Sequence, residues 1–308
     1  MTRIKLLVIS VVGFMVAATS AHGVINIQNL GASARSAALG NSFVAVADNA
    51  DAVFANPAGL GQLSKRQLSY TNVSLLYGGI DGDNLGQHVV SYAQQLGSKL
   101  GLGLGYERIG SDLMSENGAF LALSLQASQS FQLGVTAKYL FWSVGDIPPD
   151  NGVADPLSNQ SAGNIGLDVG VLWKTPVEGA QLGVLLKNVN QPNVAKDTSL
   201  GDGLPMDLHL GLAYQLGGGS MVSVQWVARD LSGDEVDNRV VVGGETRLVE
   251  GLMLRAGGSK LFETDASGEL NAGLGYVWNK LLFDYSYNIP LDLRETNGAH
   301  RFSLGYEF

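Results

Sequence analysis

The strongest constraint on this chain is an alternation of apolar and polar residues with a period of two, which continues from Gln67 to the C-terminus. In the last nine residues, Phe302, Leu304, Tyr306 and Phe308 would point to one side of a strand and the residues between them to the other. A soluble protein seldom ends on such a two-faced strand with a terminal phenylalanine. The pattern suits a strand that closes a membrane barrel, because lipid tolerates no open sheet edge.

The alternation predicts fourteen strands, an even number, as a closed antiparallel barrel of the bacterial outer membrane requires. We expect them at 67–77, 87–95, 99–108, 119–127, 131–144, 164–174, 181–189, 206–215, 221–230, 239–247, 252–262, 270–278, 281–289 and 298–308. Short connections alternate with long ones, among them a long loop over 109–118. Because such barrels have short periplasmic turns and longer outer loops, both termini are predicted to be periplasmic.

Composition agrees with an all-β membrane fold. Charged residues make up 15% of the chain, against roughly a quarter in soluble domains, and glycine is abundant at 41 residues. Past the N-terminus no apolar run approaches the ~18 residues of a membrane helix. A β-sandwich would rarely show this loop asymmetry, and a propeller would show a repeat of about 40–50 residues. The predicted fold class is therefore a 14-stranded antiparallel transmembrane β-barrel of the outer-membrane type.

The first residues have the pattern of a secretory signal peptide. Arg3 and Lys5 precede an apolar run over 6–18, and small residues at 19–21 offer a cleavage site, which places the mature start near His22. The alternative, an N-terminal anchor helix, suits the short apolar run less well. Cleavage leaves 17 basic and 28 acidic residues, a net charge of −11, which disfavours nucleic acid as a partner. The chain has no cysteine, so disulfides are excluded.

Residues 22–66 lack the period of two. Small residues fill 31–40, and an Asn56-Pro57-Ala58-Gly59 turn follows an acidic stretch. Asp48 or Asn49 is suited to cap a short helix, and Pro57 would end it. The many interleaved apolar residues argue against a disordered leader. Small side chains would let this backbone pack closely against surrounding walls.

From Leu30 to Leu60 the chain resembles the opening segment of the PorV/PorQ family and, more loosely, of the FadL family of outer-membrane fatty-acid channels. The shared features are a glycine- and alanine-rich stretch, an Ala-Asp-Asn segment and an Asn-Pro-Ala turn before the first strand. The resemblance implies a fourteen-stranded barrel whose N-terminal segment folds into the lumen. The expected organisation is a signal peptide at 1–21, a plug at 22–66 and a barrel at 67–308.

The two families imply different functions. PorV-like barrels serve the type IX secretion system, whereas FadL-like barrels pass hydrophobic small molecules. The resemblance favours a secretion-associated barrel that binds exported protein. The alternative is a channel for hydrophobic small molecules such as fatty acids. The expected partners are outer-membrane lipid, the barrel-insertion machinery, and either exported proteins and secretion components or hydrophobic ligands.

Candidate site residues fall into three groups. Charges on the inward faces are cheap in a wet or paired lumen, where they line a pathway or hold the plug. These lumen candidates are Glu107, Lys138, Asp168, Lys187, Asp207, His209, Arg229, Arg239, Glu245, Arg247, Arg255, Asp284, Arg301 and Glu307. The plug candidates are Arg35, Gly40, Asp48, Asp51, Asn56, Pro57, Ala58 and Gly59, of which Arg35, Asp48, Asp51 and Asn56 are expected to dock against the lumen charges. Phe302, Leu304, Tyr306 and Phe308 would form the barrel-closing signal read by the insertion machinery.

The sequence predicts no catalytic residue, metal site or cofactor. A hydrolase would need a nucleophile beside a base such as His209, but no Gly-x-Ser-x-Gly elbow is present. Acidic residues in the long loops have the oxygen ligands that Ca²⁺ uses, although solvated loop tips explain them better. Gly101, Gly103 and Gly105 alternate with leucines, which indicates a strand with one small face rather than a nucleotide-binding loop.

Overall fold

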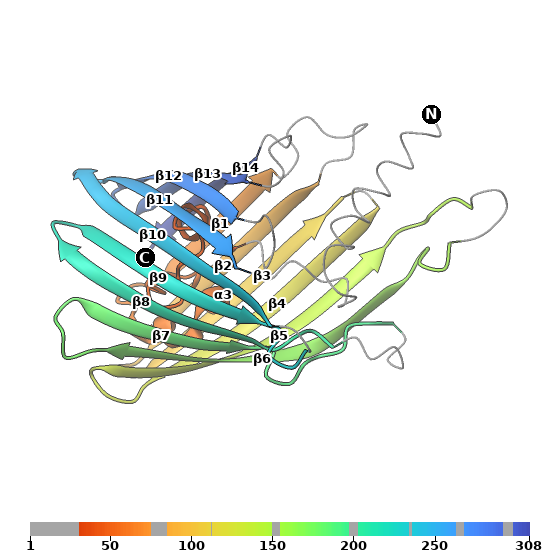
Figure 1. The fold of residues 1–308 in the computed structure, drawn as a ribbon, viewed down its shortest axis with the longest axis horizontal. Coiled ribbons are helices and arrows are strands. Elements are labelled where there is room, and N and C mark those ends of the chain that lie inside the picture. Colours follow the sequence, from red (N-terminus) through yellow and green to blue (C-terminus); the bar gives the residue numbers. More distant parts are fainter. Residues whose placement is uncertain are drawn as a thin grey trace.

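A computed structural model describes residues 31–74, 85–111, 113–149, 155–196, 203–233, 236–262, 268–291 and 298–308. The predicted signal peptide, its cleavage site and residues 22–30 lie outside these ranges. In the described part of the chain, fourteen strands pair in sequence order and antiparallel, and β1 also pairs with β14, so that the sheet closes into a barrel (Figure 1). The predicted fold class is confirmed.

The strands follow one another with few helical residues between them. Their bounds are β1 (Gln67–Ser74), β2 (Gly86–Leu96), β3 (Leu100–Gly110), β4 (Met114–Gln126), β5 (Phe131–Val144), β6 (Ser161–Lys174), β7 (Ala180–Lys187), β8 (Asp207–Gly217), β9 (Ser220–Arg229), β10 (Asp237–Val249), β11 (Leu252–Leu261), β12 (Gly268–Trp278), β13 (Leu281–Pro290) and β14 (Ala299–Glu307). The connections β2–β3, β4–β5, β6–β7, β8–β9, β10–β11 and β12–β13 share one end of the barrel, on the left in Figure 1, which we call the short-turn end. The opposite end is the long-loop end.

Each predicted strand overlaps an observed one, but the long loop expected over 109–118 is wrong. β4 begins at Met114, so only residues 111–113 separate it from β3. The prediction failed because Ser115 and Asn117 are polar where the alternation called for apolar residues. They are buried in hydrogen bonds instead, Ser115 with the Ser143 hydroxyl and Asn117 with the Tyr106 hydroxyl.

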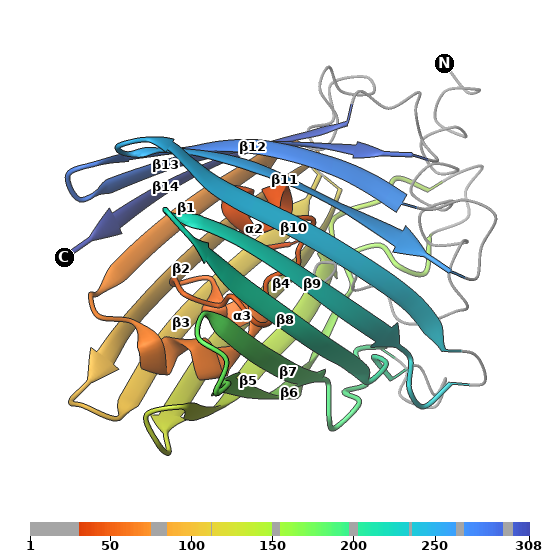
Figure 2. The ribbon, with the colours of Figure 1, turned by 60° about the vertical axis from the view of Figure 1, so that its left-hand side comes forward.

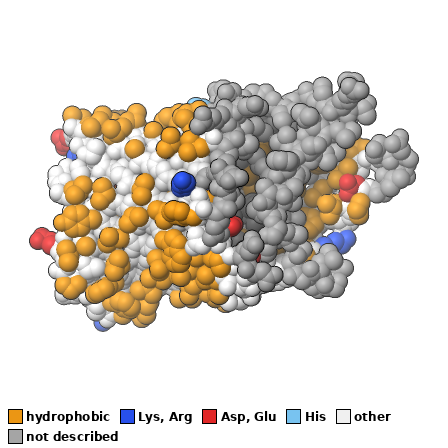
Figure 3. Space-filling model, in the orientation of Figure 1, with side chains coloured by type: hydrophobic (Ala, Val, Ile, Leu, Met, Phe, Trp, Pro, Cys, Tyr) orange, Lys and Arg blue, Asp and Glu red, His pale blue; other side chains and the backbone are white. Residues whose placement is uncertain are grey.

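The outer face of the barrel is apolar, as a wall in contact with lipid requires. On β8, Leu210, Leu212 and Tyr214 are exposed, whereas Ala213 between them is buried. Hydrophobic side chains cover much of the visible wall and charged ones are sparse there (Figure 3). Along β14, Phe302, Leu304 and Tyr306 also point outward and are exposed. No helix in the described ranges is long and apolar enough to cross a membrane.

Residues 31–66, which we call the inner segment, lie inside the barrel (Figure 2). The segment holds two short helices and a 3-10 turn: α2 (Ala34–Ala38), α3 (Ala52–Ala55) and η2 (Pro57–Gln62). α2 packs against β11–β14, and η2 packs against β2–β6. The segment therefore spans the lumen and contacts opposite walls with its two halves.

Local sequence explains these turns. Ser33 and Ser36 form a reciprocal capping box at the start of α2, and left-handed backbone at Gly40 and Asn41 follows its end. The expectation that Asp48 or Asn49 caps a helix is wrong. Asp51 is the N-cap of α3, and its side chain makes no capping bond. Asn49 accepts a hydrogen bond from the Asp51 amide, and Asp48 pairs with Arg35.

Candidate functional site

Glycines on the inward faces bring the barrel wall into contact with the inner segment. A methyl group added at any of ten of them would come closer than 3 Å to an atom of the segment. These glycines are Gly101, Gly103, Gly105, Gly134, Gly170, Gly183, Gly211, Gly243, Gly257 and Gly273. They belong to eight of the fourteen strands, so the segment is fitted to most of the circumference. Only glycine leaves room for this approach.

Buried amide side chains then fix the backbone of the segment. The Asn56 amide nitrogen donates to the carbonyl oxygen of Val44 at 2.8 Å and to that of Val171 on β6 at 3.1 Å. The Gln225 side-chain oxygen accepts from the amides of Phe43 at 3.1 Å and Val44 at 3.0 Å. These bonds satisfy polar backbone groups that are buried away from water.

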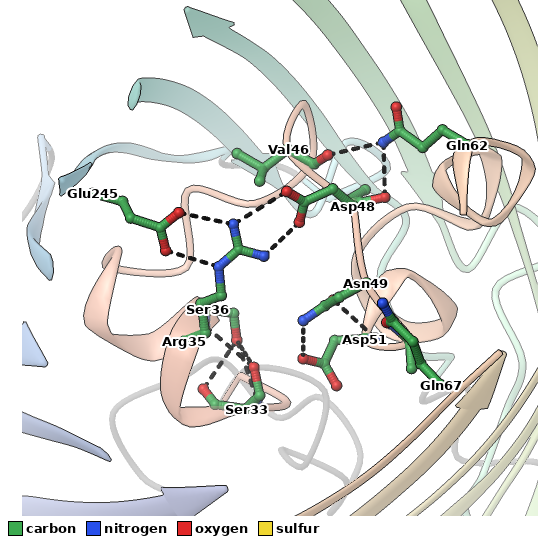
Figure 4. Close-up of polar contacts among 12 residues, drawn as sticks. Ser33, Arg35, Ser36, Val46, Asp48, Asn49, Asp51, Gln62, Gln67 and Glu245 are labelled. Atoms are coloured by element: carbon green, nitrogen blue, oxygen red, sulfur yellow. Dashed lines mark hydrogen bonds and ion pairs between the residues drawn. The ribbon is translucent and has the colours of Figure 1, made fainter. Parts of the chain in front are cut away.

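A chain of alternating charges joins the segment to β10, β11 and β13. Figure 4 shows its first part, in which Arg35 lies between Asp48 and Glu245. Arg35 pairs with Asp48 at 2.5 Å and with Glu245 at 2.9 Å, and Arg255 pairs with Glu245 and Asp284 at 2.5 Å each. Burial alone would lower the pKa of Arg35, but the carboxylates of Asp48 and Glu245 outweigh it and raise that pKa. Arg35 is therefore a fixed positive charge between two acids.

A cavity of about 100 Å³ lies between the inner segment and the long-loop half of the wall. We call it the outer cavity. One part of its lining is apolar, with Phe43, Phe54, Phe120, Leu185, Val227 and Val241. The other part carries the lumen candidates Glu107, Lys138, Asp168, Lys187, His209, Arg229 and Arg239. The cavity is thus both aromatic and charged.

Ion pairs and hydrogen bonds hold several lumen candidates in place in and around this cavity. Lys138 pairs with Asp168 at 2.6 Å, and Asp168 also accepts a hydrogen bond from the Asn188 amide. Asp207 accepts from the Asp230 amide. Arg301 donates to the Gly31 carbonyl oxygen at 3.0 Å. At the long-loop end, Trp142 donates to the carbonyl of Val194, which is buried.

The four residues expected to dock against lumen charges behave differently. Only Arg35 meets a charge of the wall. Asp48 pairs with Arg35 inside the segment, and Asp51 is buried and accepts a hydrogen bond from the Ser91 hydroxyl on β2. Asn56 contacts backbone carbonyls, whereas Pro57, Ala58 and Gly59 are packed against glycines or backbone.

Sequence reasoning missed the amide side chains of the wall. Gln225 binds two backbone amides, and Gln181 donates to the Ala45 carbonyl at 2.7 Å. Both are uncharged polar residues at inward positions of otherwise apolar strands, which is the signal that could have found them. In the described ranges, no group of three or more His, Asp or Glu side chains is placed to hold a metal ion.

Comparison with known proteins places this fold. No protein-family model matches the chain, and no curated protein matches its sequence. Among solved structures, the CymD monoaromatic hydrocarbon channel superposes with a TM-score of 0.69 at 12% identity, over 91% of this chain and 98% of that one. The toluene transporter TodX of Pseudomonas putida gives 0.63 at 14% identity, over 90% and 98%.

A FadL homologue of Pseudomonas aeruginosa gives a TM-score of 0.60 at 14% identity, again over 90% of this chain and 98% of that one. At such identities the likeness concerns the fold alone. The specific resemblance of the opening segment to the PorV/PorQ family stays a prediction. The chain is an outer-membrane-type β-barrel with the fold of the FadL-type hydrocarbon channels.

Proposed function

We propose that this protein is a bacterial outer-membrane channel for small hydrophobic molecules and that the inner segment is its plug. The observation that carries the proposal is the filled barrel of hydrocarbon-channel fold, with a partly aromatic cavity above the segment. A general diffusion pore would need an open lumen. Here the backbone of residues 31–66 is pressed against the wall.

The size of the outer cavity indicates the scale of the ligand. At about 100 Å³ it approaches the ~150 Å³ of an engineered apolar cavity that holds benzene. Phe54 and Phe120 pack edge to face, with their ring centroids 4.9 Å apart, and supply the ring surfaces that favour an aromatic ligand. We therefore propose a channel, rather than an enzyme, for molecules about the size of one aromatic ring.

Uptake of radiolabelled toluene by cells tests this proposal. The host must lack its own hydrophobic-compound channels and keep its lipopolysaccharide, because toluene crosses a plain phospholipid bilayer unaided. We expect faster uptake with the protein than with an empty vector, and no change for labelled glucose. Equal toluene uptake in both strains would contradict the proposal, and a rise for both solutes would indicate a leak.

The rival function is a secretion-associated barrel that binds exported protein. The observation in its favour is the glycine- and alanine-rich opening with its Asn56-Pro57-Ala58 turn, which resembles the PorV/PorQ family. Purification of the full chain from its native membrane distinguishes the two functions. Stoichiometric recovery of exported proteins or secretion components would favour the rival.

A further inference from the structure

The lipid-facing wall carries few charges, and these are uneven in sign and place. Every Asp and Glu within the fourteen strands occupies an inward position of the alternation. The outward positions of the same strands hold two charged side chains, Arg108 on β3 and Lys260 on β11, and both are exposed. Both lie in the long-loop part of the wall, as do the outward histidines His88 and His300. The described strands therefore present only positive charge to the lipid.

The cost of placing a charge in lipid does not explain this choice of sign. On the lipid face of a barrel, Arg and Lys cost more than Asp and Glu at the same depth. A wall in contact with neutral head groups would tolerate acids at its edge at least as well as bases. The presence of bases alone points to an anionic group in the surrounding lipid, because anionic head groups attract Lys and Arg near the membrane surface.

Lys260 lies at the depth of the head groups. It is eight residues along β11 from Leu252, the first residue of the strand at the short-turn end. At about 3.4 Å per residue and a tilt of about 40°, eight residues cover roughly 21 Å of membrane depth. The apolar band of such a barrel is about 25 Å tall, and a lysine side chain extends along apolar surface to bring its ammonium into water. The Lys260 ammonium therefore reaches the interface at the long-loop end.

The same face of the wall contains an apolar groove. It measures about 630 Å³ and crosses the outer side of β8–β12, with Tyr214 on β8 and Leu270 on β12 in its lining. Between these two side chains, Gly244, Ala256 and Gly258 carry at most a methyl group. The four strand spacings from β8 to β12 give the groove a length of about 19 Å across the sheet. An acyl chain lying in this recess would contact protein at its sides as well as beneath it, which increases the dispersion attraction.

The groove has a supported floor and a cation beside it. On the inner side of the wall, the backbone of Leu39 lies so close to Gly257 that an added methyl group would come within 2.4 Å of the Leu39 carbonyl carbon. The inner segment thus backs the floor from within the barrel. On the outer side, Lys260 follows Gly258 by two residues on the same face of β11. A chain in the groove and an anion at Lys260 can therefore belong to one lipid molecule.

We infer that this face binds lipopolysaccharide, with an acyl chain of its lipid A in the groove and a lipid A phosphate at the Lys260 ammonium. The groove suits a long apolar chain and Lys260 suits an anion, and lipid A offers both. The long-loop end is predicted to be external, and lipopolysaccharide is the phosphate-bearing lipid of the external leaflet. The inference goes beyond the proposed function and applies equally to a channel and to a secretion-associated barrel.

Native mass spectrometry of the full chain in detergent tests the inference, with lipid A as the probe and phosphatidylglycerol as the competing anionic lipid. We expect the first lipid A molecule to bind in preference to phosphatidylglycerol. Lys260→Ala should weaken this binding about fivefold, the scale of one cation at an anionic membrane surface, and Lys260→Arg should retain it. Ala256→Phe should weaken it at least as much, because the added ring fills the groove.

Two matched controls lie on the far side of the barrel. Arg108→Ala removes the outward cation that is likewise eight residues from the short-turn end of its strand, and Ala119→Phe adds a ring to the outer face of β4 away from the groove. Both should bind lipid A like the wild type. Equal losses in Lys260→Ala and Arg108→Ala would overturn the site, as would unchanged binding in Lys260→Ala and Ala256→Phe. Phosphatidylglycerol that binds as tightly as lipid A would overturn the assignment to lipopolysaccharide. Toluene uptake reports on the channel separately, so the two proposals can fail independently.

Discussion

Single glycines of the wall decide whether the inner segment fits. A methyl group on Gly243 would lie 2.6 Å from the Leu39 carbonyl oxygen, and this backbone atom has no free rotation that relieves the clash. On Gly244, the next residue, it would lie 3.8 Å from the Met221 carbonyl oxygen, which is ordinary van der Waals contact. The two positions differ in the face of β10 on which they lie.

We therefore expect Gly243→Ala to loosen the segment and Gly244→Ala to leave it in place. Overpacking costs about 1–3 kcal/mol, and 2 kcal/mol corresponds to roughly a 30-fold larger open population. Tryptic cleavage after Arg35, followed by mass spectrometry, measures that population. Equal cleavage rates in the two variants would show that the close approach is not what seats the segment.

Individual faces are the part of the structure that sequence predicts best. The alternation predicts that Phe302, Leu304 and Tyr306 share one face of the last strand, and all three are exposed on the outer wall, where lipid accepts only apolar side chains. Partners across the lumen are a different matter. That Arg35 meets Glu245 depends on barrel closure and on where the segment enters, and neither is encoded in the spacing of these residues along the chain.

At the scale of elements, ion pairs of Arg35 hold the α2 half of the inner segment. Arg35→Met removes its pairs with Asp48 and Glu245, and we expect a loss of about 2 kcal/mol in the stability of this half. The loss is below the ~3–5 kcal/mol of an orphaned buried charge, because Glu245 keeps Arg255 as a partner.

Hydrogen exchange of the amides over 34–47 measures this effect, and exchange over 57–62 should stay unchanged. Lys65→Met is the control, since it removes a pair with Glu307 in which the Lys65 side chain is 57% exposed. Such pairs contribute about 0–1 kcal/mol. Similar exchange in both variants would mean that the buried network does not anchor α2.

Asp51 gives the α3 region a pH dependence. Burial raises the pKa of its carboxyl above the ordinary aspartate value of 3.8, although the hydrogen bonds from Ser91 and Asn49 act to lower that pKa. An acid whose pKa is raised in the folded state destabilises that state once it ionises. Stability should therefore fall as the pH rises from about 3.8 through the raised pKa.

Asp51→Asn removes this titration and can still accept a hydrogen bond from Ser91. We expect its melting temperature to change less between about pH 4 and pH 7 than that of the wild type, with the larger gain at pH 7. Scanning calorimetry in detergent gives both values. Melting temperatures that rise over this range by the same amount in the wild type and in Asp51→Asn would contradict the assignment.

Elements were predictable where lipid enforces alternation and less so elsewhere. The start of β4 was missed because Ser115 and Asn117 are satisfied by neighbouring polar groups. The cap of α3 was misplaced because Asn49 binds the Asp51 amide in its own turn and Asp48 pairs with Arg35 on α2. Contacts with residues distant in the chain replaced the local rule for Ser115, Asn117 and Asp48, whereas Asn49 bonds within its own turn.

At the scale of the whole molecule, the closed ladder sets the sidedness of the chain. β1 and β14 pair from Gln67–Glu307 to Ser74–His300, so the start of β1 and the end of β14 both lie at the short-turn end. We predict that this end is periplasmic. An epitope after Phe308 should be inaccessible to antibody in intact cells, and one in the β5–β6 loop should be accessible. The reverse labelling would invert the orientation.

The ring of inward glycines also determines what remains if the inner segment is removed. Side chains usually narrow the bore of a barrel, but here eight of the fourteen strands present a glycine to the segment. A barrel emptied of residues 31–66 would have its widest cross-section where the native protein is sealed. Its electrical resistance would be set at the long-loop end, near Trp142 and the Lys138–Asp168 pair, so this scaffold suits a sensing pore whose constriction is confined to one short zone.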